Sequence, residues 1–179
     1  AYSEVLISAH APATKGDLRL NVAATDDDFR RESIDHISAY VDRARLYPNV
    51  KQVNIHFAPR RWMDDTQTRG QEGDYGLLID GVREIAAFAE GHGIEIVMGN
   101  GMAKWTGVPD DVPAVQVDWS DRNVYFGMPP EEWIQICEDV GRENFALCLD
   151  TSHVCTYTHT IADPERRAEA AMAFVARPD

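Results

Sequence analysis

Short strand-like segments and longer helix-like segments alternate along this chain. Apolar or alternating apolar and polar positions predict strands at about residues 4–9, 51–57, 94–99 and 145–150. Apolar positions spaced three to five residues apart, with proline and glycine at the ends, predict helices at about 27–46, 75–90, 130–140 and 164–176. Such alternation is typical of parallel strands joined by right-handed crossovers. We therefore predict an α/β fold of parallel βα units, forming one domain over residues 1–179.

Each predicted strand ends in a polar side chain. These residues are His10, His56, Asn100 and Asp150. In parallel α/β folds the ligand lies outside the carboxyl ends of the strands, where all these side chains should meet. A loop of about 30 residues follows Asn100 and contains Trp105, and a loop of that length inside a compact domain is usually functional. We predict a binding site at this end of the sheet.

The segment Asp150-Thr-Ser-His153 has the most specific local pattern. A carboxylate and an imidazole three residues apart, after a buried strand, can turn into one pocket. Oxygen and nitrogen ligands of this kind suit Mn²⁺, Zn²⁺ or Mg²⁺. The alternative is that Asp150 caps the next turn and His153 lies at the surface, and the local pattern does not decide between the two.

Composition and charge narrow the classes of function. The net charge of −13 argues against a general nucleic-acid or anionic-membrane binder, since such binders present basic surfaces. The three cysteines form no CxxC pair, which favours reduced thiols, and no apolar run reaches the length of a transmembrane helix. The N-terminal segment lacks the pattern of a signal peptide, so we expect a cytoplasmic protein.

The order of these motifs resembles the xylose isomerase-like TIM barrel superfamily, which includes sugar phosphate isomerases and epimerases and endonuclease IV-type AP endonucleases. The segments that carry the resemblance are ISAHAP, VNIHFAP, GIEIVMGN and FALCLDTSHV. The resemblance implies a divalent metal held by Asp150 and His153, with His153 and His56 as catalytic residues. It also implies a substrate pocket for a small carbohydrate, lined by His10, Asn100 and Trp105.

Two features depart from that family. Gly99 stands where the family has a metal-binding Glu, so the metal could be lost in this chain. The chain also offers only about four of the eight βα units of a complete barrel. A partial barrel leaves two open sheet edges, so we expect either the remainder of the barrel or a second copy of the chain to cover them.

Three functions are compatible with the sequence. The first is a metal-dependent sugar or sugar-phosphate isomerase or epimerase, which moves a proton next to a metal-polarised carbonyl. The second is an endonuclease IV-like phosphodiester hydrolase, which the acidic charge disfavours. The third is a non-catalytic barrel that has lost its metal, and Gly99 favours it.

Overall fold

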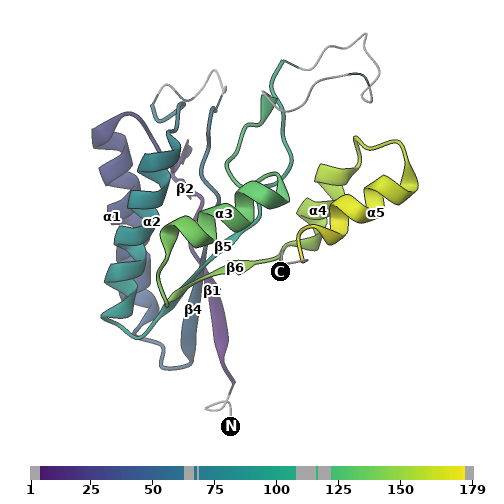
Figure 1. The fold of residues 1–179 in the computed structure, drawn as a ribbon. Coiled ribbons are helices and arrows are strands. Elements are labelled where there is room, and N and C mark those ends of the chain that lie inside the picture. The colour runs from purple at the N-terminus through teal and green to yellow at the C-terminus, as the bar shows by residue number, and fades with distance from the viewer. Residues whose placement is uncertain (1–4, 63–66, 68, 108–115, 117–121, 176–179) are drawn as a thin grey trace.

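A parallel four-stranded sheet with helices packed on one face forms the centre of the molecule (Figure 1). The structure is a computed structural model, and it describes residues 5–62, 67, 69–107, 116 and 122–175. The strands lie in the order β1 (Ile7–His10), β4 (Val50–Ile55), β5 (Glu95–Gly99) and β6 (Phe145–Cys148), and all neighbours are parallel. The prediction of parallel strands, adjacent in chain order, is confirmed.

Side chains cap the starts of the helices, except for α3 (Pro130–Val140). The others are α1 (Asp27–Ala44), α2 (Tyr75–Glu90), α4 (Thr151–Thr158) and α5 (Pro164–Met172). Asp26, Asp74 and Asp163 each accept a hydrogen bond from a first-turn amide, which satisfies donors that have no partner within the helix. Pro130 opens α3, and Gly141 ends it in the left-handed conformation.

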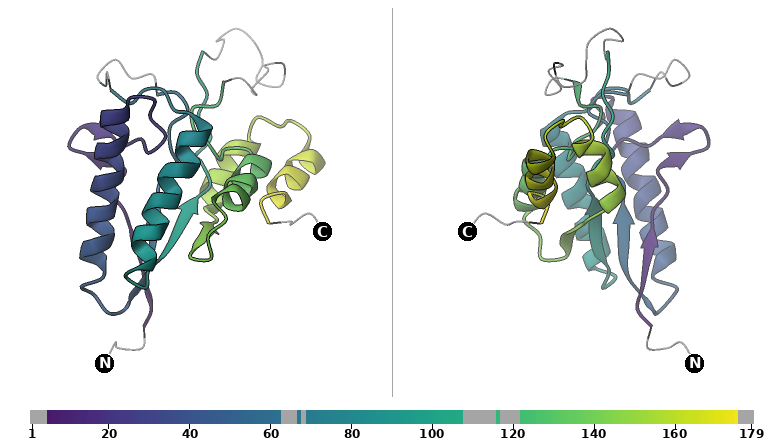
Figure 2. Two further views of the ribbon diagram at one scale, coloured as in Figure 1. Left: turned by 60° about the vertical axis from the view of Figure 1, so that its left-hand side comes forward. Right: turned by 90° about the vertical axis from the view of Figure 1, so that its right-hand side faces the viewer.

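The core lies between the sheet and helices α1 and α2, which Figure 2 shows side by side on one face. Alternate strand residues point into this core: Val53, Ile55, Ile96 and Met98 are at most 1% exposed. The residues between them face the opposite side, which in a complete barrel is the interior. That side carries polar residues beside the buried Val97, and Gln52 donates a hydrogen bond of 2.8 Å to Glu95 across β4 and β5.

Three details differ from the expectations. Residues 151–158 form helix α4, where we expected a loop. A short antiparallel hairpin, β2 (Thr14–Lys15) and β3 (Leu18–Arg19), follows β1. The first strand begins at Ile7, later than expected, because Ile7 pairs with Val50, where its partner strand β4 begins. Residue 4 lies outside the described residues.

The long segment after Asn100 packs back onto the domain where it is described. Isolated β-bridges join Trp105 to Asn123 and Pro59 to Tyr125. The three consecutive residues 124–126 are each at most 1% exposed. This segment therefore builds a small second core next to the carboxyl ends of the strands, made with Phe57 and Met128. Within the described ranges, no helix is long and apolar enough to cross a membrane.

Candidate active site

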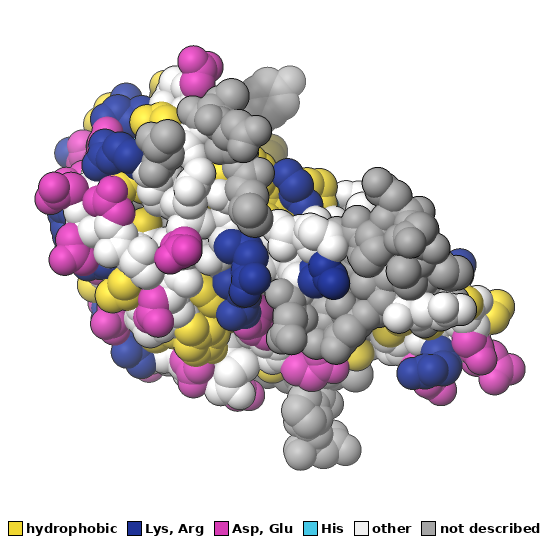
Figure 3. Space-filling view, turned by 90° about the horizontal axis from the view of Figure 1, so that it is seen from above, with side chains coloured by type: hydrophobic (Ala, Val, Ile, Leu, Met, Phe, Trp, Pro, Cys, Tyr) yellow, Lys and Arg dark blue, Asp and Glu magenta, His cyan; other side chains and the backbone are white. Residues whose placement is uncertain are grey.

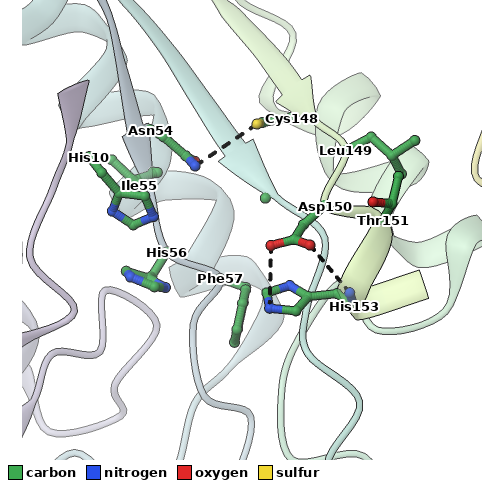
Figure 4. A pocket seen from close by; sticks show the side chains of 11 residues that line it. His10, Asn54, Ile55, His56, Phe57, Cys148, Leu149, Asp150, Thr151 and His153 are labelled. Carbon is green, nitrogen blue, oxygen red and sulfur yellow. Dashed lines mark hydrogen bonds and ion pairs between the residues drawn. The ribbon is translucent and has the colours of Figure 1, made fainter. Parts of the chain in front are cut away.

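A cavity of about 290 Å³ opens at the carboxyl end of the sheet (Figure 4). It is lined by residues from or just after all four strands: His10, Asn54, Ile55, His56, Phe57, Gly99, Cys148, Leu149, Asp150, Thr151 and His153. The parallel register explains this convergence, because His10, Asn54 and Val97 are direct neighbours across β1, β4 and β5. The structure thus brings His10, His56, Asp150 and His153 to one cavity.

His10 and His56 form a pair on one wall of the cavity. Their ring centroids lie 4.5 Å apart, with the ring planes at 56°. Nδ1 of His10 donates a hydrogen bond of 2.8 Å to the carbonyl of Ala11, so in the neutral ring Nε2 is the acceptor. Burial, assisted by the charge of Arg19 and by His10 and His153 in their protonated forms, lowers the pKa of His56 to about 4. His56 is therefore a neutral imidazole at pH 7, able to accept a proton or a hydrogen bond.

Asp150 faces the pair from the end of β6, and it is also the N-cap of helix α4. Its Oδ1 accepts hydrogen bonds from the Ser152 hydroxyl (2.6 Å) and from the amides of Ser152 (2.9 Å) and His153 (3.3 Å). The bond from the Ser152 hydroxyl is the main reason why the pKa of Asp150 is lowered. The sequence left open whether Asp150 caps a helix or faces a pocket, and in the structure it does both. Its Oδ1 caps helix α4, and its Oδ2 lies 3.6 Å from Nε2 of His153.

The orientation of His153 is set by its other ring nitrogen. Nδ1 lies 2.8 Å from the carbonyl oxygen of Asn100, and a carbonyl only accepts, so Nδ1 carries the proton. In the neutral ring Nε2 then has a lone pair directed at the same side as Oδ2 of Asp150 (Figure 4). Two electron-rich atoms at this separation favour a cation between or beside them, either a proton or a metal ion.

Asn100 has a position that the sequence did not predict. Its side chain is fully buried, donating to the carbonyl of Asp150 (3.2 Å) and accepting from the amide of Asp150 (2.7 Å). It ties the end of β5 to the end of β6 behind the cavity.

Trp105 lines a separate cavity of about 510 Å³ with Arg60, Glu132 and Tyr157. Contact of Asn100 and Trp105 with a substrate stays a prediction.

The cavity offers only part of a metal site. Asp150 Oδ2 and His153 Nε2 are suitable ligands, but the described residues contain no group of three or more metal-ligating side chains. Gly99 lines the cavity, and a Cβ built on it would have the Cys148 carbonyl, at 3.9 Å, as its nearest neighbour. A Cβ would therefore fit there in ordinary van der Waals contact. Asp150 and His153 fit a divalent ion as two of its ligands, and any others must come from beyond these residues.

Some cavity residues could not be singled out from strand ends alone. Asn54 lies one pleat before His56 on the same face, and its amide is 3.9 Å from Sγ of Cys148. The period of two in residues 50–56 contains this signal. Phe57 separates the two halves of the site, with its ring 5.7 Å from that of His56 and 5.6 Å from that of His153.

Comparisons with known proteins agree with this geometry. Residues 2–176 match the xylose isomerase-like TIM barrel family. A D-tagatose 3-epimerase-like protein is 20% identical over 94% of this chain and 52% of its own, with a TM-score of 0.59. A xylose isomerase-like TIM barrel protein from Mycobacterium smegmatis, solved in complex with magnesium, is 13% identical over 94% of this chain and 48% of its own, with a TM-score of 0.57.

A third solved structure belongs to the nuclease side of the superfamily. AP endonuclease, family 2, from Brucella melitensis is 15% identical over 94% of this chain and 55% of its own, with a TM-score of 0.56. No curated protein matches the sequence. The chain spans about half the length of these solved structures. The sequence resemblance is confirmed: the chain belongs to the xylose isomerase-like TIM barrel family, of whose barrel it forms a part.

Proposed function

We propose that this chain carries part of the active site of an isomerase or epimerase that acts on a sugar or sugar phosphate. The observation that supports it is the pairing of Asp150 Oδ2 and His153 Nε2 in one cavity with the neutral His56. A divalent ion, when bound by Asp150 and His153, would polarise the carbonyl and the adjacent hydroxyl of the sugar. His56 would accept a hydrogen bond or a proton, since it is a neutral imidazole at pH 7, and His10 would orient the hydroxyls through Nε2, the ring nitrogen that does not bond Ala11.

Metal binding tests the two ligands directly. We expect Mn²⁺ to bind weakly to the chain in isothermal titration, because one carboxylate and one imidazole provide little charge and few ligands. Asp150→Asn keeps an oxygen that can cap helix α4 but removes the charge, so it should abolish binding without unfolding the helix. Gly99→Glu should tighten binding by placing a second carboxylate in the cavity.

Equal affinity in the wild type, Asp150→Asn and Gly99→Glu would show that the cavity is not a metal site. That result would favour the non-catalytic alternative, for which the specific evidence is Gly99 itself. Activity is tested separately, by following proton exchange with solvent next to the carbonyl of a ketose panel. Nicking of abasic duplex DNA without ketose turnover would instead support the phosphodiester hydrolase.

A further inference from the structure

A cationic and aromatic cluster borders the candidate active site. The guanidinium of Arg19 lies 5.0 Å from the ring centroids of both Trp62 and Tyr125, and 5.9 Å from that of Phe57. The ammonium of Lys104 lies 4.2 Å from the Trp62 ring. Five residues from four separate segments of the chain thus meet, and two of them are cations. We name Arg19, Trp62, Lys104 and Tyr125 the Arg19 cluster.

The backbone of Arg19 is held in place by a buried amide. Gln67 is 3% exposed, and its side chain accepts from the Arg19 amide (2.8 Å) and donates to the Arg19 carbonyl (3.0 Å). This reciprocal pair continues the ladder of hairpin strand β3. Because the backbone is fixed and the aromatic rings contact the guanidinium, the head of Arg19 is positioned rather than free in solvent.

Within the part of the chain that the structure describes, the two cations of the cluster have no carboxylate partner. Among the described residues, neither Arg19 nor Lys104 forms an ion pair, and neither side chain donates a hydrogen bond. Other arginines of this acidic chain do have partners, for example Arg31 with Glu84 and Arg142 with Glu90. Stacking on an aromatic face occupies the plane of a guanidinium and leaves its in-plane N–H donors available. Arg19 therefore presents unused donors.

The cluster adjoins the histidine cavity. Phe57 lies between them, and Arg19, His56 and Phe57 also line one small crevice. The charge of Arg19 reaches the cavity, since it contributes to the low pKa of His56. Figure 3 views the molecule from above, toward the carboxyl ends of the strands, and it shows Lys and Arg side chains near the middle of this face while many acidic side chains lie along its rim.

We propose that Arg19, assisted by Lys104, binds an anionic group, a phosphate or a carboxylate, of the ligand that enters the histidine cavity. The inference deepens the proposed function, on which it rests, because it selects charged sugars over neutral ketoses such as the tagatose named in a structural neighbour. A neutral sugar would offer these two cations no counter-charge, whereas an anionic one would. A phosphate or carboxylate accepts the parallel N–H bonds that an arginine fork offers.

Binding of inorganic phosphate to the full chain, measured by titration calorimetry, is the primary test. Arg19→Gln should weaken phosphate binding by about tenfold or more, the usual loss when a charge-assisted hydrogen bond is removed. Lys104→Gln should cause a smaller loss, because Lys104 is exposed. The matched control is Arg43→Gln, which removes the same charge from an exposed position in the last turn of α1 and should change nothing.

Affinities for three sugar ligands identify the anionic group and test this inference separately from the proposed function. D-ribulose 5-phosphate and D-ribonate are compared with D-ribulose, and the charged ligand whose affinity falls in Arg19→Gln identifies the group. Phosphate binding that depends on Arg19, without turnover of any ketose, would support the anion site and count against the isomerase. The inference is overturned if the wild type binds no anion, or if Arg19→Gln and Arg43→Gln bind alike.

Discussion

Asn100 should contribute more to stability than its position near the cavity suggests. Asn100→Ala removes two hydrogen bonds to Asp150 and leaves the buried side-chain space empty. A buried backbone group that loses its partner costs about 1–3 kcal/mol, and two groups of Asp150 are affected here. Since water can reach the half-buried Asp150, we expect a loss of about 2–4 kcal/mol in the free energy of unfolding.

Urea denaturation followed by circular dichroism measures this loss. The control is Asn123→Ala, since Asn123 is also buried, at 9% exposure, but its side chain forms no hydrogen bond within the described residues. We expect the control to lose about 1 kcal/mol or less, as substitutions outside hydrogen-bond networks do. Equal losses in the two variants would refute the reasoning that the Asn100 amide ties the ends of β5 and β6 together.

Three further predictions follow from other parts of the structure. Gly81→Ala should lower the melting temperature although alanine favours helices, because its Cβ would lie 2.8 Å from the Val22 carbonyl oxygen. A raised melting temperature would mean that α2 can move away from Val22. The low pKa of His56, about 4, means that its stability contribution is complete above pH 6.5 and is lost as pH falls toward 4. His56→Gln should flatten this part of the stability profile, and an unchanged profile would exclude His56 as its cause. Because β1 and β6 are sheet edges, we expect the 179-residue chain alone to self-associate, and light scattering showing a stable monomer would contradict this.

The sequence predicted the sheet well because burial on parallel strands leaves a strong local pattern. Val53 and Ile55 alternate with polar residues, and the strands after them are short apolar segments. The sequence pattern does not predict helix α4, because TSHVCTYT has several β-branched residues and no clear apolar stripe. The helix is supported by the Asp150 cap and by packing of Val154 and Tyr157 near Trp133 and Phe174.

The parts of the site that escaped prediction depend on contacts between distant segments. Arg19, Trp62 and Tyr125 are far apart in sequence, and none belongs to a local motif. Trp105, which we expected in the substrate pocket, is joined to Asn123 by a bridge and lines another cavity, and nothing in the loop pattern indicates that position. Local patterns therefore located the strand ends, but not the loop residues that surround them.

The environment of Gly99 has an evolutionary consequence. The backbone there needs no glycine, since its φ is not positive and a Cβ would contact nothing closer than 3.9 Å. The neighbouring carboxylate and imidazole are held by Ser152 and Asn100, neither of which depends on the residue at this position. Glycine and glutamate codons can differ by a single base, so one point mutation could add or remove the acidic group while the fold stays intact. The number of acidic groups facing this cavity can thus change in either direction by one base.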